Sequence, residues 1–165
     1  MICGMADLYF STPSRIAALK AEADSWLGTP FIDGIGRRAK KGTASDCGSW
    51  IAATLQAVGA IGAVPWPRAY VSQTGGPEML ETLINTLSAV PRLRCLYLAS
   101  EDPEAGIPLI PGDLLVGSTG KAHHHMVLYI GNNVIYHCWA GQVRVGNIHD
   151  TMLAKHMHSI WRAIE

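Results

Sequence analysis

The sequence has little charge and no excess of either sign. Charged residues make up 16% of the 165 residues, and 13 basic side chains balance 13 acidic ones. A protein that binds nucleic acid or an anionic membrane surface through its charge needs a field of basic residues. A formal net charge of zero does not supply one, so we expect no nucleic-acid partner.

The sequence also lacks a long apolar run. No stretch reads as a transmembrane helix, and Met1 to Asp7 do not combine a charged segment with an apolar one, as a signal peptide does. We therefore expect no membrane insertion and, by default, a cytoplasmic protein. Delivery to the cell wall by a route without a signal peptide stays open.

Cysteine is scarce and widely spaced, at Cys3, Cys47, Cys95 and Cys138. This spacing suits reduced thiols better than a disulfide framework. With 48% hydrophobic residues, the chain is long enough to bury a core without such staples. We predict one domain over residues 1–165.

Two apolar periodicities divide the chain. Spacing near 3.6 predicts helices from Thr12 to Gly28, from Cys47 to about Gly59, and from Pro77 to Pro91. Beyond Pro91 the period is two, and it predicts strands at 93–98, 113–116, 124–130, 134–139, 142–145 and 159–164. A short helix is expected at 151–158. Helices followed by an antiparallel meander predict an α+β fold.

The stretch from Ser45 to Leu55 places a cysteine at the start of an apolar helix. Ser45 and Asp46 are both helix-capping residue types, so we expect Cys47 in the first turn. The positive end of a helix stabilises a thiolate and lowers the pKa of a thiol below its usual ~8.5. A buried structural cysteine that opens a core helix is the alternative.

Histidines on two predicted strands favour the reactive thiol. The alternation of 124–130 puts His125 on one face with Val127 and Tyr129, and His137 lies on the next strand. If the strands pair through the turn at 131–133, the two histidines can be neighbours, and Cys47 completes a Cys–His–His arrangement. A register slip by one residue reverses the face, so His123 and His124 remain alternatives to His125.

Four segments resemble, in order, the motifs of the NlpC/P60 papain-like cysteine peptidases. They are Trp26–Phe31, Asp46–Ser49 at the nucleophile, Pro111–Leu115, and His125–Gly131 with Ile135 to His137 after it. The correspondence runs over roughly residues 14–165. The resemblance implies a papain-like fold in which a helix-borne cysteine packs on a small antiparallel sheet.

The resemblance also implies a chemistry. Cys47 would be the nucleophile, His125 the base and His137 the group that orients His125, with the backbone N–H of Cys47 as an oxyanion donor. It implies hydrolysis of short peptide amide bonds, best fitted by peptidoglycan stem peptides, through an acyl-enzyme thioester. No metal or cofactor is implied.

Several positions depart from the family pattern. Phe31 stands where many members have a tyrosine, Gly48-Ser49 inverts the usual Ser-Gly, and Val127 occupies a position that is commonly glycine. The candidate substrate-binding residues are Phe31, Arg37, Arg38 and Trp50. The two arginines precede the nucleophile and could attract an anionic substrate, although a solvated loop face is the simpler reading.

Three other functions remain open. An acyltransferase or thioesterase could use the same Cys–His pair, a zinc protein could use His123, His125 and His137, and a non-catalytic module could bind cell wall. The expected partner is a peptidoglycan-derived peptide. Resemblance to phage-tail, gene-transfer-agent and secreted-toxin members also suits a phage-tail, secretion-system or immunity partner.

Overall fold

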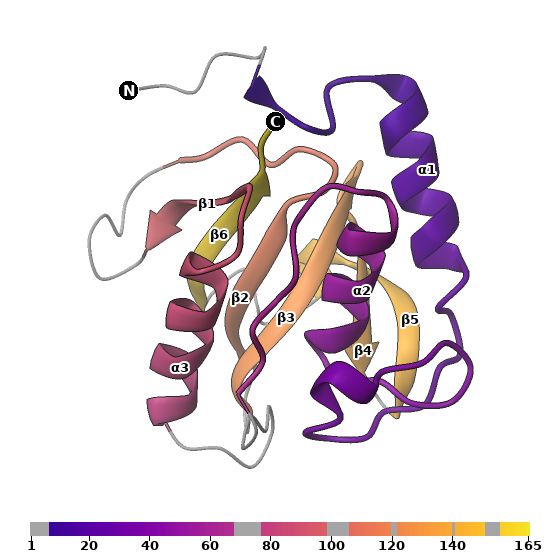
Figure 1. Ribbon diagram of the computed structural model, residues 1–165, viewed down its shortest axis with the longest axis vertical. Coiled ribbons are helices and arrows are strands. Elements are labelled where there is room, and N and C mark those ends of the chain that lie inside the picture. The colour runs from indigo at the N-terminus through magenta and orange to yellow at the C-terminus, as the bar shows by residue number, and fades with distance from the viewer. Residues whose placement is uncertain (1–6, 68–76, 99–105, 120–121, 140, 151–155) are drawn as a thin grey trace.

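The structure, a computed structural model, describes residues 7–67, 77–98, 106–119, 122–139, 141–150 and 156–165. It has the predicted α+β architecture, with helices packed on an antiparallel sheet (Figure 1). The helices are α1 (Pro13–Asp24), α2 (Ser49–Ala57) and α3 (Pro77–Ser88), with 3-10 turns η2 (Gly36–Arg38) and η3 (Ile148–Asp150). None of the helices in the described part of the chain is long and apolar enough to span a membrane.

Two of the differences between observed and predicted helix boundaries bear on the site. Helix α1 begins as expected, with the Thr12 hydroxyl accepting from the amide of Arg15, but it ends at Asp24 rather than Gly28. The amide of Gly28 donates instead to the carbonyl of Val143, which draws the chain toward the sheet. Helix α2 begins at Ser49, so Cys47 lies in the turn before the helix and not in its first turn.

The strands form one six-stranded antiparallel sheet in the order β1-β6-β2-β3-β4-β5. Their bounds are β1 (Leu93–Leu98), β2 (Leu114–Thr119), β3 (Ala122–Gly131), β4 (Val134–Trp139), β5 (Gln142–Asn147) and β6 (Met157–Ala163). The meander holds for β2 to β5, but β6 inserts between β1 and β2, which the sequence did not predict. Of the predicted helix at 151–158, residues 151–155 lie outside the described residues, and 157–158 belong to β6.

The turn between β3 and β4 follows from its sequence. Asn132 and Asn133 both have positive φ, 51° and 64°, as the type I′ hairpin turn requires. This turn sets the register in which Val127 faces His137. The hairpin that carries both predicted histidines is therefore fixed by local chemistry.

The sheet separates two apolar clusters. The larger one joins residues of α1, α2 and α3 to alternate residues of β2, β3 and β4, including Met126, Leu128 and Tyr136. Figure 1 shows α2 and α3 on the same side of the sheet. The smaller cluster holds the intervening residues, such as Val127 and Ile135. Val127, which stands where the family commonly has glycine, is thus a buried core residue.

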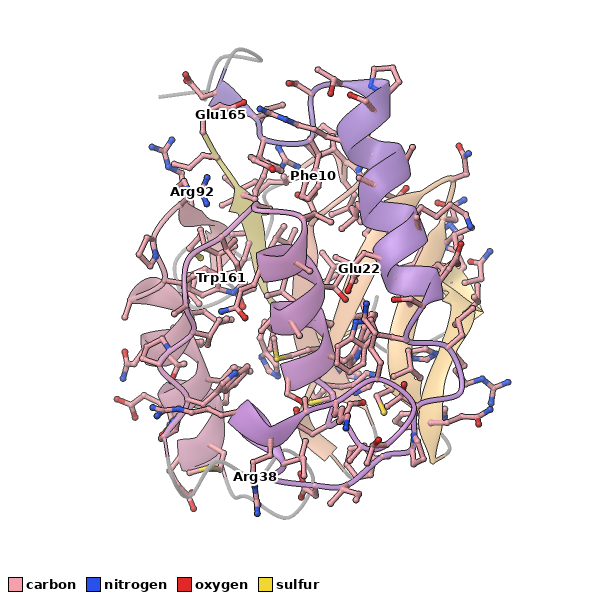
Figure 2. All side chains as sticks on the ribbon, turned by 45° about the vertical axis from the view of Figure 1, so that its right-hand side comes forward. Phe10, Glu22, Arg38, Arg92, Trp161 and Glu165 are labelled. Carbon is pink, nitrogen blue, oxygen red and sulfur yellow. The ribbon has the colours of Figure 1, made fainter. Side chains whose placement is uncertain are left out.

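The segment Pro111–Leu115 connects β2 to its neighbour β6 through an ion pair. The buried carboxylate of Asp113 accepts two hydrogen bonds of 2.7 Å from the guanidinium of Arg162, which joins β2 to β6. Gly112 has φ +94°, and a Cβ there would lie 2.1 Å from the ring of Phe10, which Figure 2 labels. The glycine is needed for both backbone conformation and space.

We expect Gly112→Ala to lower the free energy of unfolding by at least ~2 kcal/mol, because it adds a clash with Phe10 to the strain of positive φ. Gly42→Ala is the matched control, because Gly42 has φ +68° but no atom within 4 Å of a Cβ built there. Urea denaturation of both variants measures the difference. Equal losses would show that the approach of Phe10 is not a constraint.

Candidate active site

The turn that carries Cys47 is built on the carboxylate of Asp46. Its Oδ1 accepts from the amides of Gly48 (3.1 Å) and Ser49 (2.7 Å), and the hydroxyl of Ser49 accepts in return from the amide of Asp46 (3.0 Å). This reciprocal pair caps α2 although Gly48 is the formal N-cap. Cys47 is held between them and is 2% exposed.

The strand segment before the turn is tied to β5. The amide of Phe31 donates to Gly141 (2.8 Å) and that of Val143 to Thr29 (2.9 Å), and Phe31 bridges Ser45 in parallel. The chain is thereby laid along the edge of the sheet before it reaches Cys47. The side chain of Phe31 packs against the larger apolar cluster.

The structure brings His125 and His137 together. Nε2 of His125 lies 3.2 Å from Nδ1 of His137, and the two side chains are 3% and 6% exposed. The β3–β4 register explains the contact. Val127 is the direct cross-strand partner of His137, and His125, two residues before Val127 on the same face of β3, is therefore the diagonal neighbour of His137. The side chains of His123 and His124 lie outside the described residues.

Trp139 covers this pair. Its ring is parallel to that of His137 at 6.2 Å and meets that of His125 edge-on at 5.3 Å, while the side chain remains 41% exposed. The position follows from the alternation of β4, which puts His137 and Trp139 on one face. The sequence analysis did not select Trp139. Its position two residues after His137 on the same predicted strand could have indicated that the two side chains share a face.

The surroundings of His137 disfavour its charged form. Burial, and next the positive charge of Arg144 on β5, lower the pKa of His137 from 6.5 to about 4. At neutral pH this imidazole is therefore uncharged, with one N–H and one lone pair. It can accept a hydrogen bond from His125 at the nitrogen that faces it.

Contacts on both sides of Cys47 connect its turn to the histidine strands. A Cβ built on Gly48 would lie 2.6 Å from Sδ of Met126, the neighbour of His125. The Ser45 hydroxyl lies 3.6 Å from Sγ of Cys138, the neighbour of His137. The first contact explains why glycine follows the cysteine here, because a side chain would displace Met126. Burial raises the pKa of Cys138 to about 11, so this thiol stays protonated.

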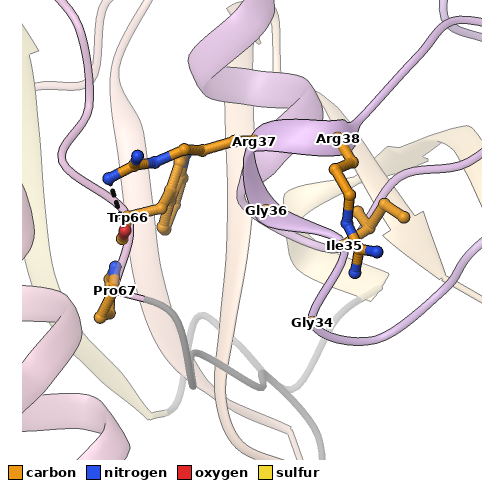
Figure 3. Close-up of a pocket in the computed structure, with 7 residues that line it drawn as sticks. All are labelled: Gly34, Ile35, Gly36, Arg37, Arg38, Trp66 and Pro67. Atoms are coloured by element: carbon orange, nitrogen blue, oxygen red, sulfur yellow. Dashed lines mark hydrogen bonds between the residues drawn. The ribbon is translucent and has the colours of Figure 1, made fainter.

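The predicted substrate-binding residues divide into two groups. Trp50 is fully buried (0% exposed) and packs in the larger cluster, and its role as a substrate contact stays a prediction. Arg37 and Arg38 line an open pocket of about 260 Å³ together with residues that the sequence analysis did not select (Figure 3). These are Gly34, Ile35, Gly36, Trp66 and Pro67.

The pocket shares a wall with the turn of Cys47. The amide of Gly36 donates to Oδ2 of Asp46 (3.0 Å), and the ring of Trp66 lies 3.0 Å from a Cβ built on Gly48. Arg37 donates to the carbonyl of Trp66 (3.1 Å) across the pocket, and Arg38 is a second arginine in its lining (Figure 3). Figure 2 shows Arg38 at the end of the molecule opposite Glu165.

Comparison with known proteins identifies the fold and the family. The profile of the NlpC/P60 family matches residues 28–162. The chain belongs to the NlpC/P60 family. Its members are generally cysteine peptidases or amidases that act on cell-wall peptides. A search of curated protein sequences found no match.

Solved NlpC/P60 structures share this fold at low sequence identity. A lipoprotein-like NLP/P60 protein of Staphylococcus aureus is 17% identical, with a TM-score of 0.55 over 99% of this chain and 46% of that chain. NlpC1 of Trichomonas vaginalis is 16% identical, with a TM-score of 0.52 over 100% of this chain and 47% of that chain. The P60 domain of an M. avium subspecies paratuberculosis antigen is 18% identical, with a TM-score of 0.54 over 92% of this chain and 96% of that chain. The chain thus spans under half the length of the first two proteins.

No metal-binding group of three or more His, Cys, Asp or Glu residues occurs among the residues that the structure describes. The zinc hypothesis included His123, whose side chain is not among them. The oxyanion role of the Cys47 amide in this NlpC/P60 domain stays a prediction.

The buried histidine pair predicts acid sensitivity for this NlpC/P60 domain. The pKa of His137 is about 4 in the folded state and near 6.5 when unfolded, so its contribution to stability is complete above pH 6.5. It is lost as the pH falls from 6.5 toward 4, by at most about 3 kcal/mol. Urea midpoints across this range should fall less steeply for His137→Gln than for wild type.

The control is His149→Gln, which removes an exposed histidine on η3. It should leave the wild-type slope unchanged. Burial also lowers the pKa of His158, so part of the slope will persist in His137→Gln. An identical slope in His137→Gln and wild type would contradict the neutral state of His137.

Proposed function

We propose that this domain is a cysteine peptidase or amidase that hydrolyses short peptide amides in peptidoglycan stem peptides, with Cys47, His125 and His137 as its triad. The supporting observation is the buried His125–His137 hydrogen bond of 3.2 Å, together with a capped Cys47 turn whose Gly48 abuts Met126, the residue after His125. A base held by a third group next to a thiol is the arrangement that nucleophilic catalysis needs.

The proposal assigns the proton positions of the pair. With His137 uncharged and accepting at Nδ1, His125 carries its proton on Nε2, and its Nδ1 is the basic nitrogen. In the proposal, Nδ1 takes the thiol proton of Cys47. His137 then stabilises the imidazolium of His125 through the same hydrogen bond and holds its ring in place.

The reaction then runs in two balanced halves. The thiolate attacks the amide carbonyl carbon, and the tetrahedral intermediate places its oxyanion beside the Cys47 amide. The C–N bond breaks as His125 returns the proton to the leaving amine, which leaves a thioester. Water then attacks the thioester while His125 takes its proton, and the thiol and a carboxylic acid are released.

The proposal makes a demand on the sheet. Val127 and Tyr129, on the same face of β3 as His125, belong to the smaller cluster, whereas Cys47 packs in the larger one. The proposal therefore requires the Cys47 thiol to reach the imidazole of His125 from the side of the sheet on which Gly48 abuts Met126. Tight packing there is consistent with a glycine after the nucleophile.

The pocket beside Asp46 supports a peptide with an acidic group as substrate. Its volume of about 260 Å³ suits one part of a peptide rather than a whole ligand. Arg37 and Arg38 bring positive charge, and Trp66 adds an apolar wall. Stem peptides carry free carboxylates, and guanidinium groups bind carboxylates well.

Mass spectrometry of soluble muropeptides, before and after incubation with the protein, tests the function. We expect wild type to release products with a new amine and a new carboxylate. Cys47→Ser and His125→Ala should lower turnover by ~10²–10⁴-fold or more, because each removes a reacting group. His137→Gln, which keeps a hydrogen-bonding side chain, should retain more activity than His137→Ala.

Three results would contradict the proposal. Turnover of a fatty-acyl thioester or lipid ester by Cys47, without any muropeptide product, would favour an acyltransferase or thioesterase. Full activity of His125→Ala together with an inactive His124→Ala would move the base by one residue. Retention of muropeptides without cleavage would indicate a binding module.

The pocket predicts a dependence on ionic strength. The kcat/KM for an acidic muropeptide should fall as salt rises, because salt screens charge attraction beyond ~8–10 Å. Arg38→Gln should weaken that dependence. Arg37→Gln should also raise KM, because it removes the hydrogen bond to Trp66 that spans the pocket. Kinetics from low to moderate salt measure both effects.

Lys40→Gln provides the control, because Lys40 is an exposed cation of the same loop that does not line the pocket. Its salt dependence should match wild type. If Arg38→Gln and Lys40→Gln behave alike, the pocket does not bind the acidic group.

A further inference from the structure

We propose that β5 positions His137 from the side opposite His125: Gly146 leaves the space that its Nε2 requires, and Arg144, its cross-strand partner, sets a positive charge beside its ring. This inference rests on the proposed role of His137 as the hydrogen-bond partner of His125. It assigns two positioning residues to a strand that none of the motifs includes.

Gly146 allows a close approach between the backbone of β5 and the imidazole. A Cβ at this position would lie 3.0 Å from Nε2 of His137 and 3.5 Å from Cγ1 of Ile135. At 3.0 Å the imidazole would have to move by a few tenths of an ångström. Glycine weakens a strand, so its presence here fits a site of close approach.

Arg144 contributes through its charge. It is the direct cross-strand partner of His137 in the β4–β5 register, and its exposed position lets the guanidinium remain solvated. The titratable groups that the flanking strands present to His137 are His125 from β3 and Arg144 from β5. A cation at Arg144 disfavours a second cation on His137, and it adds to the effect of burial on the pKa of His137.

The two residues favour the same tautomer. A neutral imidazole that accepts at Nδ1 must carry its proton on Nε2, the atom that faces Gly146. Gly146 leaves room for the proton on Nε2, and the positive charge of Arg144 disfavours a second proton on the same ring. Both effects favour the neutral imidazole that accepts at Nδ1. The pair then takes up a single proton, on His125, where the reaction needs it.

Nuclear magnetic resonance of the histidine rings tests Arg144 directly. In Arg144→Gln, the titration midpoint of His137 should rise by about 0.5 pH unit, because a partly screened cation has been removed. Arg94→Gln is the matched control, since Arg94 is an exposed arginine on β1, the opposite edge strand. It should leave the midpoint of His137 unchanged.

Kinetics separate positioning from substrate binding. The acid limb of kcat in Arg144→Gln should move to higher pH by the same amount, with KM unchanged. Gly146→Ala should lower kcat by roughly 10-fold at unchanged KM, because it displaces the ring that orients His125. Its His137 resonances should shift while circular dichroism remains that of wild type.

The outcomes are distinguishable from a failure of the proposed function. If His137 titrates alike in Arg144→Gln, Arg94→Gln and wild type, the inference about Arg144 is wrong, whether or not muropeptides are cleaved. Unmoved His137 resonances in Gly146→Ala would likewise overturn the role of Gly146. Shifted resonances in a protein without muropeptide activity would support the positioning of His137 and count against the peptidase alone.

Discussion

The buried carboxylate of Asp46 joins the parts of the site that the rest of the structure supports. It accepts from the amide of Gly36 in the pocket loop and from the amides of Gly48 and Ser49 at the start of α2. A buried charge is tolerated only when its oxygens are hydrogen-bonded, so these three amides have little freedom to move apart. The turn of Cys47, the first turn of α2 and one pocket wall are therefore held as a unit.

A second constraint is the exclusion of water from the histidine pair. His125 and His137 are enclosed by the sheet and by the ring of Trp139, which leaves their hydrogen bond without competition from solvent. Low local polarity strengthens this bond and at the same time disfavours charge on His137. One environment thus strengthens the hydrogen bond and keeps His137 uncharged at neutral pH.

Local signals made much of the fold predictable. The Asn132-Asn133 turn and the alternation of β3 and β4 are encoded within a few residues, and they bring His125 to His137. The placement of β6 between β1 and β2 depends on pairing over long sequence separations, which periodicity does not report. The Pro-Gly-Asp motif has a structural role, because the carboxylate of Asp113 binds Arg162 of β6.

The candidate site was predictable only in part, for similar reasons. Cys47 and the histidines stand in recognisable motifs, whereas Trp66 reaches the pocket from a segment without regular structure, and Arg144 acts from across a strand pair. The complete burial of Trp50 was not predictable, because α2 is apolar on most of its sides. Periodicity does not tell which side of such a helix faces a cleft.

The central place of β6 has a consequence for the order of biosynthesis. Strand β6 is the last of the six in the chain, yet β1 and β2 each pair with it and not with one another. While the ribosome is still adding residues before Met157, β1 has no neighbour and Asp113 has no Arg162 to neutralise it. The nascent chain can form the β2–β5 meander early, but the complete sheet waits for the final strand. The scaffold of the site is thus complete only after β6 has joined the five strands that precede it in the chain.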